Sequence, residues 1–335
     1  MSEIISDEVK KVWPKSAPSI SNINKYVAKY KNEIIVIKYG GNVLIDREVF
    51  NNFIMDNFNE KILTVNDKMF KYVESGSGKL VLLVHGWPEN SSSWKNQLSL
   101  ISNLGYKAVA FNIRGYADSY SPKEISSYSM RFFIEDILDI ISFFKEKSAI
   151  LIGHDWGAPI CWNTAAYHKD KIDAVIGLSV PFTRRGKISS TELWKNLYKD
   201  IFFYQNYFQK INQPELELEK NVFDTISKIY YWCSAEGYID KVKTTTSLKS
   251  GLLDGIPLPL DRLSWLKSTD LNHVVNDFKK SGFLGSLNRY RAQDLDWIEL
   301  EELDYLQIDQ PSIVIGGEYD PVRFFIKNYD AYKEP

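Results

Sequence analysis

The segment Gly153-His154-Asp155-Trp156-Gly157 constrains the fold of this 335-residue chain more than any other. An apolar run, Ala149 to Ile152, precedes it, and Ala158 to Tyr167 follow with helical spacing. This order predicts a buried strand, a sharp turn and a helix. Glycine on both sides suits such a turn, because a Cβ would crowd it. The sequence therefore predicts a strand-turn-helix elbow that presents the side chain of Asp155.

A carboxylate at the tip of an elbow indicates different chemistry from a serine. Attack by a hydroxyl on a carbonyl gives an acyl-enzyme, whereas a carboxylate suits displacement at an sp3 carbon and leaves an alkyl ester on the protein. An ordinary turn with a helix-capping aspartate would show the same pattern. Other segments are needed to decide whether Asp155 is a nucleophile or a helix-capping residue.

A second motif, His85-Gly86-Trp87-Pro88, follows the apolar run Leu80 to Val84. A second predicted strand thus ends in a loop of the kind that presents backbone NH groups to an oxyanion. We expect the NH groups of Trp87 and Trp156 to be the two donors. The other residues of the motif are expected to support the loop: His85, Gly86 and Pro88. A plain turn is the alternative interpretation.

Together these residues resemble the HGxP and GHDWG motifs of the soluble epoxide hydrolases, a family with the α/β-hydrolase fold. The resemblance runs from about residue 57 to the end. It implies a mostly parallel sheet with helices on both faces, an inserted α-helical cap and an alkyl-enzyme ester on Asp155. Residues 114–119 match the family's RGYGDS loop except at Ala117, where alanine replaces glycine and tolerates positive φ poorly.

The same resemblance implies two cap tyrosines. Residues 203–209 and 286–291 look like the family's tyrosine motifs and contain Tyr204 and Tyr290. A phenol can donate a proton or a hydrogen bond to the alkoxide that leaves when an epoxide opens. Because the chain has 20 tyrosines, the local motif and not the residue type selects these two.

The resemblance also implies a relay acid at Asp320, which follows the predicted strand Ser312 to Ile315. In the family this acid orients a histidine that activates water. The chain has four histidines, and none follows Asp320. They are His85, His154, His168 and His273. We therefore expect a truncated chain in which Asp155 attacks, ester hydrolysis lacks its base, and a sheet edge is exposed.

Residues 34–42 are a predicted strand and glycine turn that resemble the start of acetylglutamate kinase, where such NH groups face ATP phosphates. The fragment is too short to build a nucleotide pocket, so kinase activity is the least favoured alternative. The predicted domains are an orphan fragment at 1–56, a first core part at 57–182, a helical cap at 183–296 and a second core part at 297–335.

The predicted strands alternate with helical periodicity. They are Lys61–Val65, Met69–Glu74, Leu80–His85, Ala108–Ile113, Ala149–Ile152, Ala174–Val180 and Ser312–Ile315. The cap pattern is aromatic and helical, which predicts a lid over a pocket for a small apolar epoxide and water. The cap aromatics are Trp194, Phe202, Phe203, Phe208, Trp232 and Trp265.

Composition agrees with a soluble enzyme. The chain has 41 basic and 43 acidic residues and no basic block, which argues against a nucleic-acid partner. No apolar stretch reaches the ~18 residues of a membrane span, and Met1 to Trp13 do not resemble a signal peptide, so a cytoplasmic location is expected. Cys161 and Cys233 are expected to be packing residues, and no metal or cofactor is implied.

Two rival functions stay open, and a third is disfavoured. Haloalkane dehalogenases resemble this family in fold, aspartate nucleophile and the tryptophan after it, but a halide leaves without a proton and needs no tyrosine pair. A binding protein of this fold would keep the pocket without turnover, and the missing histidine supports that alternative. An ester hydrolase is disfavoured, because a carboxylate that attacks an acyl group forms an anhydride and is expelled again.

Overall fold

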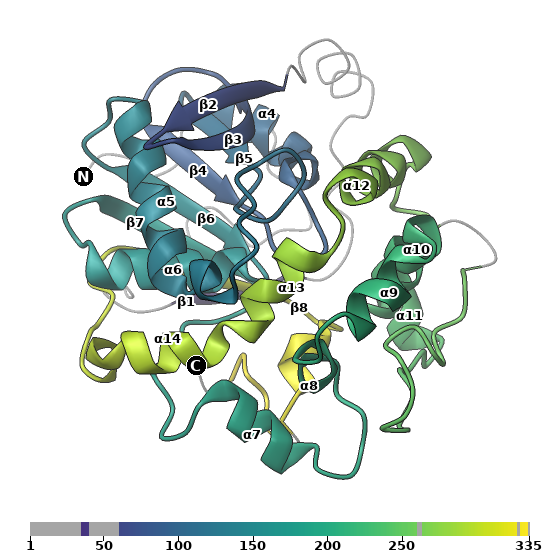
Figure 1. The fold of residues 1–335 in the computed structure, drawn as a ribbon. Coiled ribbons are helices and arrows are strands. Elements are labelled where there is room, and N and C mark those ends of the chain that lie inside the picture. The colour runs from purple at the N-terminus through teal and green to yellow at the C-terminus, as the bar shows by residue number, and fades with distance from the viewer. Residues whose placement is uncertain (1–34, 40–59, 260–262, 327–328, 334–335) are drawn as a thin grey trace.

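Short aliphatic runs form the sheet at the centre of the molecule (Figure 1). The computed structural model describes residues 35–39, 60–259, 263–326 and 329–333. These residues form an eight-stranded sheet in the order β1-β8-β7-β6-β4-β5-β3-β2. Pairing is parallel from β1 to β5 along this order and antiparallel for β3 and β2. The strands are β1 Ile35–Tyr39, β2 Lys61–Val65, β3 Lys68–Ser75, β4 Leu80–Val84, β5 Lys107–Phe111, β6 Ala149–His154, β7 Ile172–Leu178 and β8 Ser312–Gly317.

The predicted strands of the hydrolase part are confirmed, with ends that differ by up to about two residues. Strand β4 shows why its sequence is apolar throughout. Val81 and Leu83 pack with helix α4 (Lys95–Asn103) on one face, whereas Leu80, Leu82 and Val84 belong to the larger core on the other. A parallel strand buried on both faces needs apolar residues at every position.

Strand β1 corrects one expectation. The edge of β8 is not exposed, because β1 pairs with it in parallel from Ile35 opposite Ile313 to Tyr39 opposite Gly317. Residues 35–39, part of the fragment predicted to be an orphan, thus belong to the hydrolase sheet. The glycine turn at 40–42 and the rest of the kinase-like segment lie outside the described residues.

Helices cover the sheet and form a separate layer beside it (Figure 1). Three helices follow core strands: α4 Lys95–Asn103, α5 Met130–Phe143 and α6 Gly157–Tyr167. The chain between β7 and β8 has helices and no strand among its described residues, with loops such as 242–259 between them. Its helices are α7 Ser190–Leu197, α8 Tyr204–Phe208, α9 Gln213–Glu219, α10 Val222–Trp232, α11 Ala235–Ile239, α12 Ser268–Ser281, α13 Leu284–Arg291 and α14 Gln293–Glu299. Short 3-10 helices lie at Ser91–Trp94 (η1), Ile125–Tyr128 (η2), Glu301–Asp304 (η3) and Pro321–Phe324 (η4).

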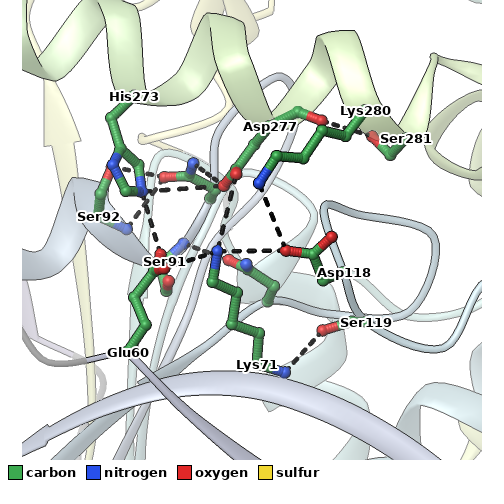
Figure 2. Close-up of polar contacts among 12 residues, drawn as sticks. Glu60, Lys71, Ser91, Ser92, Asp118, Ser119, His273, Asp277, Lys280 and Ser281 are labelled. Atoms are coloured by element: carbon green, nitrogen blue, oxygen red, sulfur yellow. Dashed lines mark hydrogen bonds and ion pairs between the residues drawn. The ribbon is translucent and has the colours of Figure 1, made fainter.

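A buried polar cluster joins α12 of the cap to the core (Figure 2). Nζ of Lys71, on β3, lies 2.8 Å from the Glu60 carboxylate and 3.9 Å from that of Asp277. Asp277 also accepts a hydrogen bond from Nδ2 of Asn90 at 2.7 Å, and Nε2 of His273 lies 3.3 Å from Glu60. Lys71 and Asp277 are only 8% and 4% exposed. Charges buried in this way need partners, so the cluster ties the cap helix to β3 and to the loop after β4.

The two cysteines differ. Both are free, Cys161 is buried in α6, and Cys233 is exposed at the end of α10. The packing role predicted for Cys233 is not confirmed, because its side chain is exposed, although the surrounding protein raises the pKa of its thiol.

Candidate active site

The turn between β6 and α6 lifts Asp155 off the sheet. Its φ is +49°, in the left-handed region that costs a residue with a Cβ. A Cβ on Gly153 would collide with the backbone of Gly157, and a Cβ on Gly157 would collide with the carbonyl of Val84. The strand-turn-helix elbow predicted from the sequence is present, and its two glycines are required by the close approach of three backbone segments.

The loop after β4 directs a backbone donor at the same carboxylate. The NH of Trp87 donates to Oδ1 of Asp155 at 2.8 Å, and the NH of Trp156 also hydrogen-bonds this side chain. The two expected donors therefore converge on one place, because β4 and β6 are neighbours in the sheet and end at the same edge.

The side chain of His85, in the same loop, makes two hydrogen bonds to backbone groups. Its Nδ1 is 2.9 Å from the carbonyl oxygen of Gly86, and its Nε2 accepts from the NH of Ile113 at 3.1 Å. A carbonyl only accepts and an NH only donates, so the ring is the neutral tautomer with hydrogen on Nδ1. Burial lowers the pKa of His85 to about 4, which keeps the ring neutral. His85 thus links the loop to the end of β5.

Tyr204 and Tyr290 come together although 86 positions separate them in the chain. Their ring centroids are 5.9 Å apart, and the ring of Tyr290 lies 5.2 Å from that of Trp156. Burial raises the pKa of both phenols, and the negative charge of Asp155 raises it further. Both hydroxyls therefore carry their protons at neutral pH and can donate them.

Asp155, Tyr204 and Tyr290 line the same cavity, which has a volume of about 220 Å³. Its lining is mostly apolar, which suits a small apolar ligand with one polar reacting group. The lining residues are Asp155, Trp156, Pro159, Val180, Pro181, Thr183, Trp194, Tyr204, Gln205, Tyr290, Val322, Phe325, Ile326, Tyr329 and Ala331.

The other predicted cap aromatics have different positions. Phe202, Phe203 and Trp232 line a neighbouring cavity of about 270 Å³, which shares Tyr204 and Phe325 with the first. Phe208 is fully buried, with its ring 5.1 Å from that of Trp87. Trp265 is 54% exposed and lines neither cavity.

Comparison with known proteins places the chain in a family. Residues 79–324 match the family described as alpha/beta hydrolase fold. The chain is 30% identical over 273 residues to "Epoxide hydrolase A" of Mycobacterium tuberculosis, covering 80% of this chain and 84% of that protein. It is 32% identical to "Epoxide hydrolase" of Caballeronia sordidicola, covering 78% of each. The crystal structure of Epoxide Hydrolase A from Mycobacterium thermoresistibile superposes with a TM-score of 0.76 at 32% identity, over 80% of this chain and 85% of that one.

The chain belongs to the epoxide hydrolase family of the α/β-hydrolase fold.

Burial sets the electrostatics of this epoxide hydrolase family member at Asp155. It raises the pKa of that carboxyl from an ordinary 3.8 to about 6, although the charge of His154 and the NH groups of Trp87 and Trp156 act in the opposite direction. The carboxyl is therefore mostly ionised at pH 7, yet it is a stronger base than a solvated aspartate.

An ion pair beside the nucleophile was not predicted from the sequence. Nδ1 of His154 lies 3.0 Å from Oε2 of Glu89, which follows the HGWP motif directly. Burial disfavours the charged ring, but the Glu89 carboxylate, with smaller contributions from Asp155 and Asp320, outweighs burial and raises the pKa of His154 to about 9. His154 is part of one motif and Glu89 directly follows the other, so the expectation that the two motifs lie on neighbouring strands could have revealed the pair.

Asp320 lies at the end of β8, as predicted, where its Oδ1 accepts from the NH of Val322 at 2.9 Å and caps η4. Burial raises the pKa of Tyr332, and the nearby Asp320 carboxylate raises it further. The remaining histidines have other positions: His168 ends α6, and His273 is on α12.

The described residues hold no group of three or more His, Cys, Asp or Glu side chains arranged to bind a metal ion. Within the same residues, no helix is both long and apolar enough to cross a membrane.

Proposed function

We propose that this chain opens a small apolar epoxide to a vicinal diol through an alkyl ester on Asp155, with water as the second substrate. The observation that carries the proposal is one cavity lined by the Asp155 carboxylate and by two phenols whose raised pKa keeps them protonated. Membership of the family supports the reaction class.

In the first step a carboxylate oxygen of Asp155 attacks a ring carbon, and the bond from that carbon to the epoxide oxygen breaks. The epoxide oxygen takes a proton from Tyr204 or Tyr290, because an unprotonated alkoxide is a poor leaving group. Trp87 and Trp156 hold the other carboxylate oxygen through their NH groups.

In the second step a water oxygen adds to the ester carbonyl carbon. The resulting oxyanion lies where the NH groups of Trp87 and Trp156 meet. The bond between the former carbonyl carbon and the alkoxy oxygen of the ester then breaks. One proton of the water goes to the diol hydroxyl, and the other restores the phenol. We assign Asp320 as the relay acid of this step, although the sequence has no histidine after Asp320 for it to orient, so this step is expected to be the slow one. We assign residues 183–296 as the lid over the core parts 57–182 and 297–335.

The test is to incubate the protein with styrene oxide and, separately, with 1-chlorohexane. We expect an adduct of the epoxide mass on Asp155 by peptide mass spectrometry, and none in the Asp155→Ala variant. An adduct from the chloroalkane alone would identify a dehalogenase. Reversible binding of styrene oxide without any adduct would identify a binding protein. Either result would refute the proposal.

A further inference from the structure

Two buried glutamines form a chain of hydrogen bonds between the hydroxyl of Tyr204 and the backbone of Tyr290. Gln205, on α8, lines the cavity and is 8% exposed, and Gln293, at the start of α14, is 7% exposed. Nε2 of Gln205 donates to the Tyr204 hydroxyl at 3.0 Å. Nε2 of Gln293 lies 3.2 Å from Oε1 of Gln205 and 3.0 Å from the backbone carbonyl oxygen of Tyr290.

The hydrogen bond between Gln293 and the backbone carbonyl of Tyr290 fixes the direction of the other two. A backbone carbonyl can only accept, so the amide group of Gln293 must turn its NH2 toward Tyr290. The second hydrogen on that nitrogen then meets Gln205, which must present its carbonyl oxygen. The NH2 of Gln205 is left facing Tyr204. With either amide turned over, two donors or two acceptors would face each other in a buried site, which costs about 1–3 kcal/mol for each unsatisfied group.

This arrangement affects both the direction of the Tyr204 O–H bond and the ease with which that hydroxyl gives up its proton. The Tyr204 oxygen accepts from Gln205 and also takes part in a side-chain hydrogen bond with Tyr290. Its own O–H bond therefore points away from Gln205, and Tyr204 lines the cavity. An accepted hydrogen bond also stabilises a developing phenolate, and the contact with Gln205 opposes the rise in the pKa of Tyr204 that burial and the Asp155 charge cause. Both effects favour donation of the proton to a ligand oxygen.

We propose that Gln205 is a positioning residue that turns the Tyr204 hydroxyl proton toward the epoxide oxygen, and that Gln293 sets the orientation of Gln205. The inference rests on the proposed function, because it concerns the proton transferred when Asp155 bonds to the ring carbon. Gln205 does not itself exchange a proton with the substrate.

The experiment measures the rate of adduct formation on Asp155 with styrene oxide by rapid quench and mass spectrometry, which requires no turnover. Gln205→Met keeps the length of the side chain and removes the donor. We expect a loss of about tenfold in the rate, equal to one hydrogen bond of roughly 1.4 kcal/mol, with unchanged dissociation constant for the epoxide. Gln293→Met frees the Gln205 amide to turn over and is expected to give a smaller loss.

Gln209→Met is the matched control. Nε2 of Gln209 donates to the backbone carbonyls of Gln205 and Tyr290, at 3.0 Å in both cases, but not to Tyr204. Its rate of adduct formation should change by less than about twofold. An equal loss in this variant would show a general effect of packing and would overturn the proposal.

The decisive comparison repeats Gln205→Met in a Tyr204→Phe background. Loss of the donor should have no further effect there, since there is no hydroxyl left to orient. A full loss in both backgrounds, or none in either, refutes the role of Gln205 while the proposed function stands. A Tyr204→Phe variant that forms the adduct at the normal rate refutes the acid role of Tyr204 itself. Thermal unfolding of each variant identifies any that fail to fold, and Gln293→Met then provides the test.

Discussion

Nδ2 of Asn90 lies 2.7 Å from Oδ2 of Asp277, in a hydrogen bond that joins helix α12 to the segment three positions after Trp87, whose NH donates to Asp155. The Asn90 side chain also accepts from the NH of Ser92 at 3.0 Å and so caps η1. The helical segment between β7 and β8 therefore contacts the loop that carries the Trp87 NH, in addition to contributing Tyr204 from α8 and Tyr290 from α13.

Replacing Asp277 by alanine should lower the free energy of unfolding by about 2–3 kcal/mol. The change leaves Asn90 without its acceptor and removes one of the carboxylates that face the buried Lys71. Urea unfolding measures the effect. The control is Lys79→Ala, because Lys79, which pairs with Asp173 at 3.1 Å, is half-exposed and its ion pair should be worth less than about 1 kcal/mol. Equal losses in the two variants would contradict a structural role for the cluster.

Asp155 is expected to reduce the stability of the folded protein at neutral pH. Its pKa is about 6 in the folded state and 3.8 ordinarily, and this difference corresponds to about 3 kcal/mol at 1.36 kcal/mol for each pH unit. A raised folded-state pKa stabilises the protein below the unfolded value, and that stability is lost as the pH rises through about 6. Asp155→Asn should therefore be more stable than the wild type by about 1–3 kcal/mol at pH 7.5, and the gain should shrink toward pH 4. A gain that is constant with pH would show that ionisation is not its cause.

The rate of adduct formation should depend on the same ionisation. Because the attacking group is the carboxylate, the rate should rise with pH through about 6 and then level off. His154→Gln removes the nearby positive charge that lowers the pKa of Asp155 and leaves Glu89, which raises it. The midpoint should therefore move upward, by at least about half a pH unit. A midpoint that stays at 6, or falls, would mean that His154 does not act on Asp155 electrostatically.

The features that the sequence predicted correctly depend on short segments. The elbow follows from glycines within two positions of Asp155, and β4 from an unbroken apolar run. Trp87, Trp156, Tyr204 and Tyr290 were selected through motifs local to each residue, and their roles stay predictions. The convergence of Trp87 and Trp156 on Asp155 follows from the rule that parallel strands end at a common edge.

The features that it did not predict depend on contacts between distant segments. Gln205 and Gln293 are 88 positions apart, and the orientation of their amides is set by a backbone carbonyl, which no side-chain pattern reveals. The pairing of β1 with β8 joins segments more than 270 positions apart. Trp265 was expected in an aromatic lid, but composition alone does not distinguish a lining residue from an exposed one.

Ala117→Gly should stabilise the protein by about 0.5–1 kcal/mol. Alanine occupies this position with a φ of +49°, which glycine adopts without steric cost. The gain should be visible as a higher urea midpoint at an unchanged slope. Ala166→Gly, in the helix α6, is the control with the opposite sign and should destabilise by at least about 1 kcal/mol. Destabilisation by both changes would show that the loop at 114–119 does not strain Ala117.

The 335-residue chain should form the ester on Asp155 faster than it hydrolyses it. No histidine follows Asp320 in the sequence, and His154 is a poor base at neutral pH because Glu89, working against burial, raises its pKa to about 9 and keeps it protonated. With excess styrene oxide we expect close to one equivalent of adduct to accumulate, with diol released much more slowly. Mass spectrometry of the intact protein and chromatography of the diol measure the two steps. Added imidazole supplies a base and should speed diol release, while Asp155→Ala should give neither product. Linear diol formation over many turnovers with no adduct would show that another group in this chain activates the water.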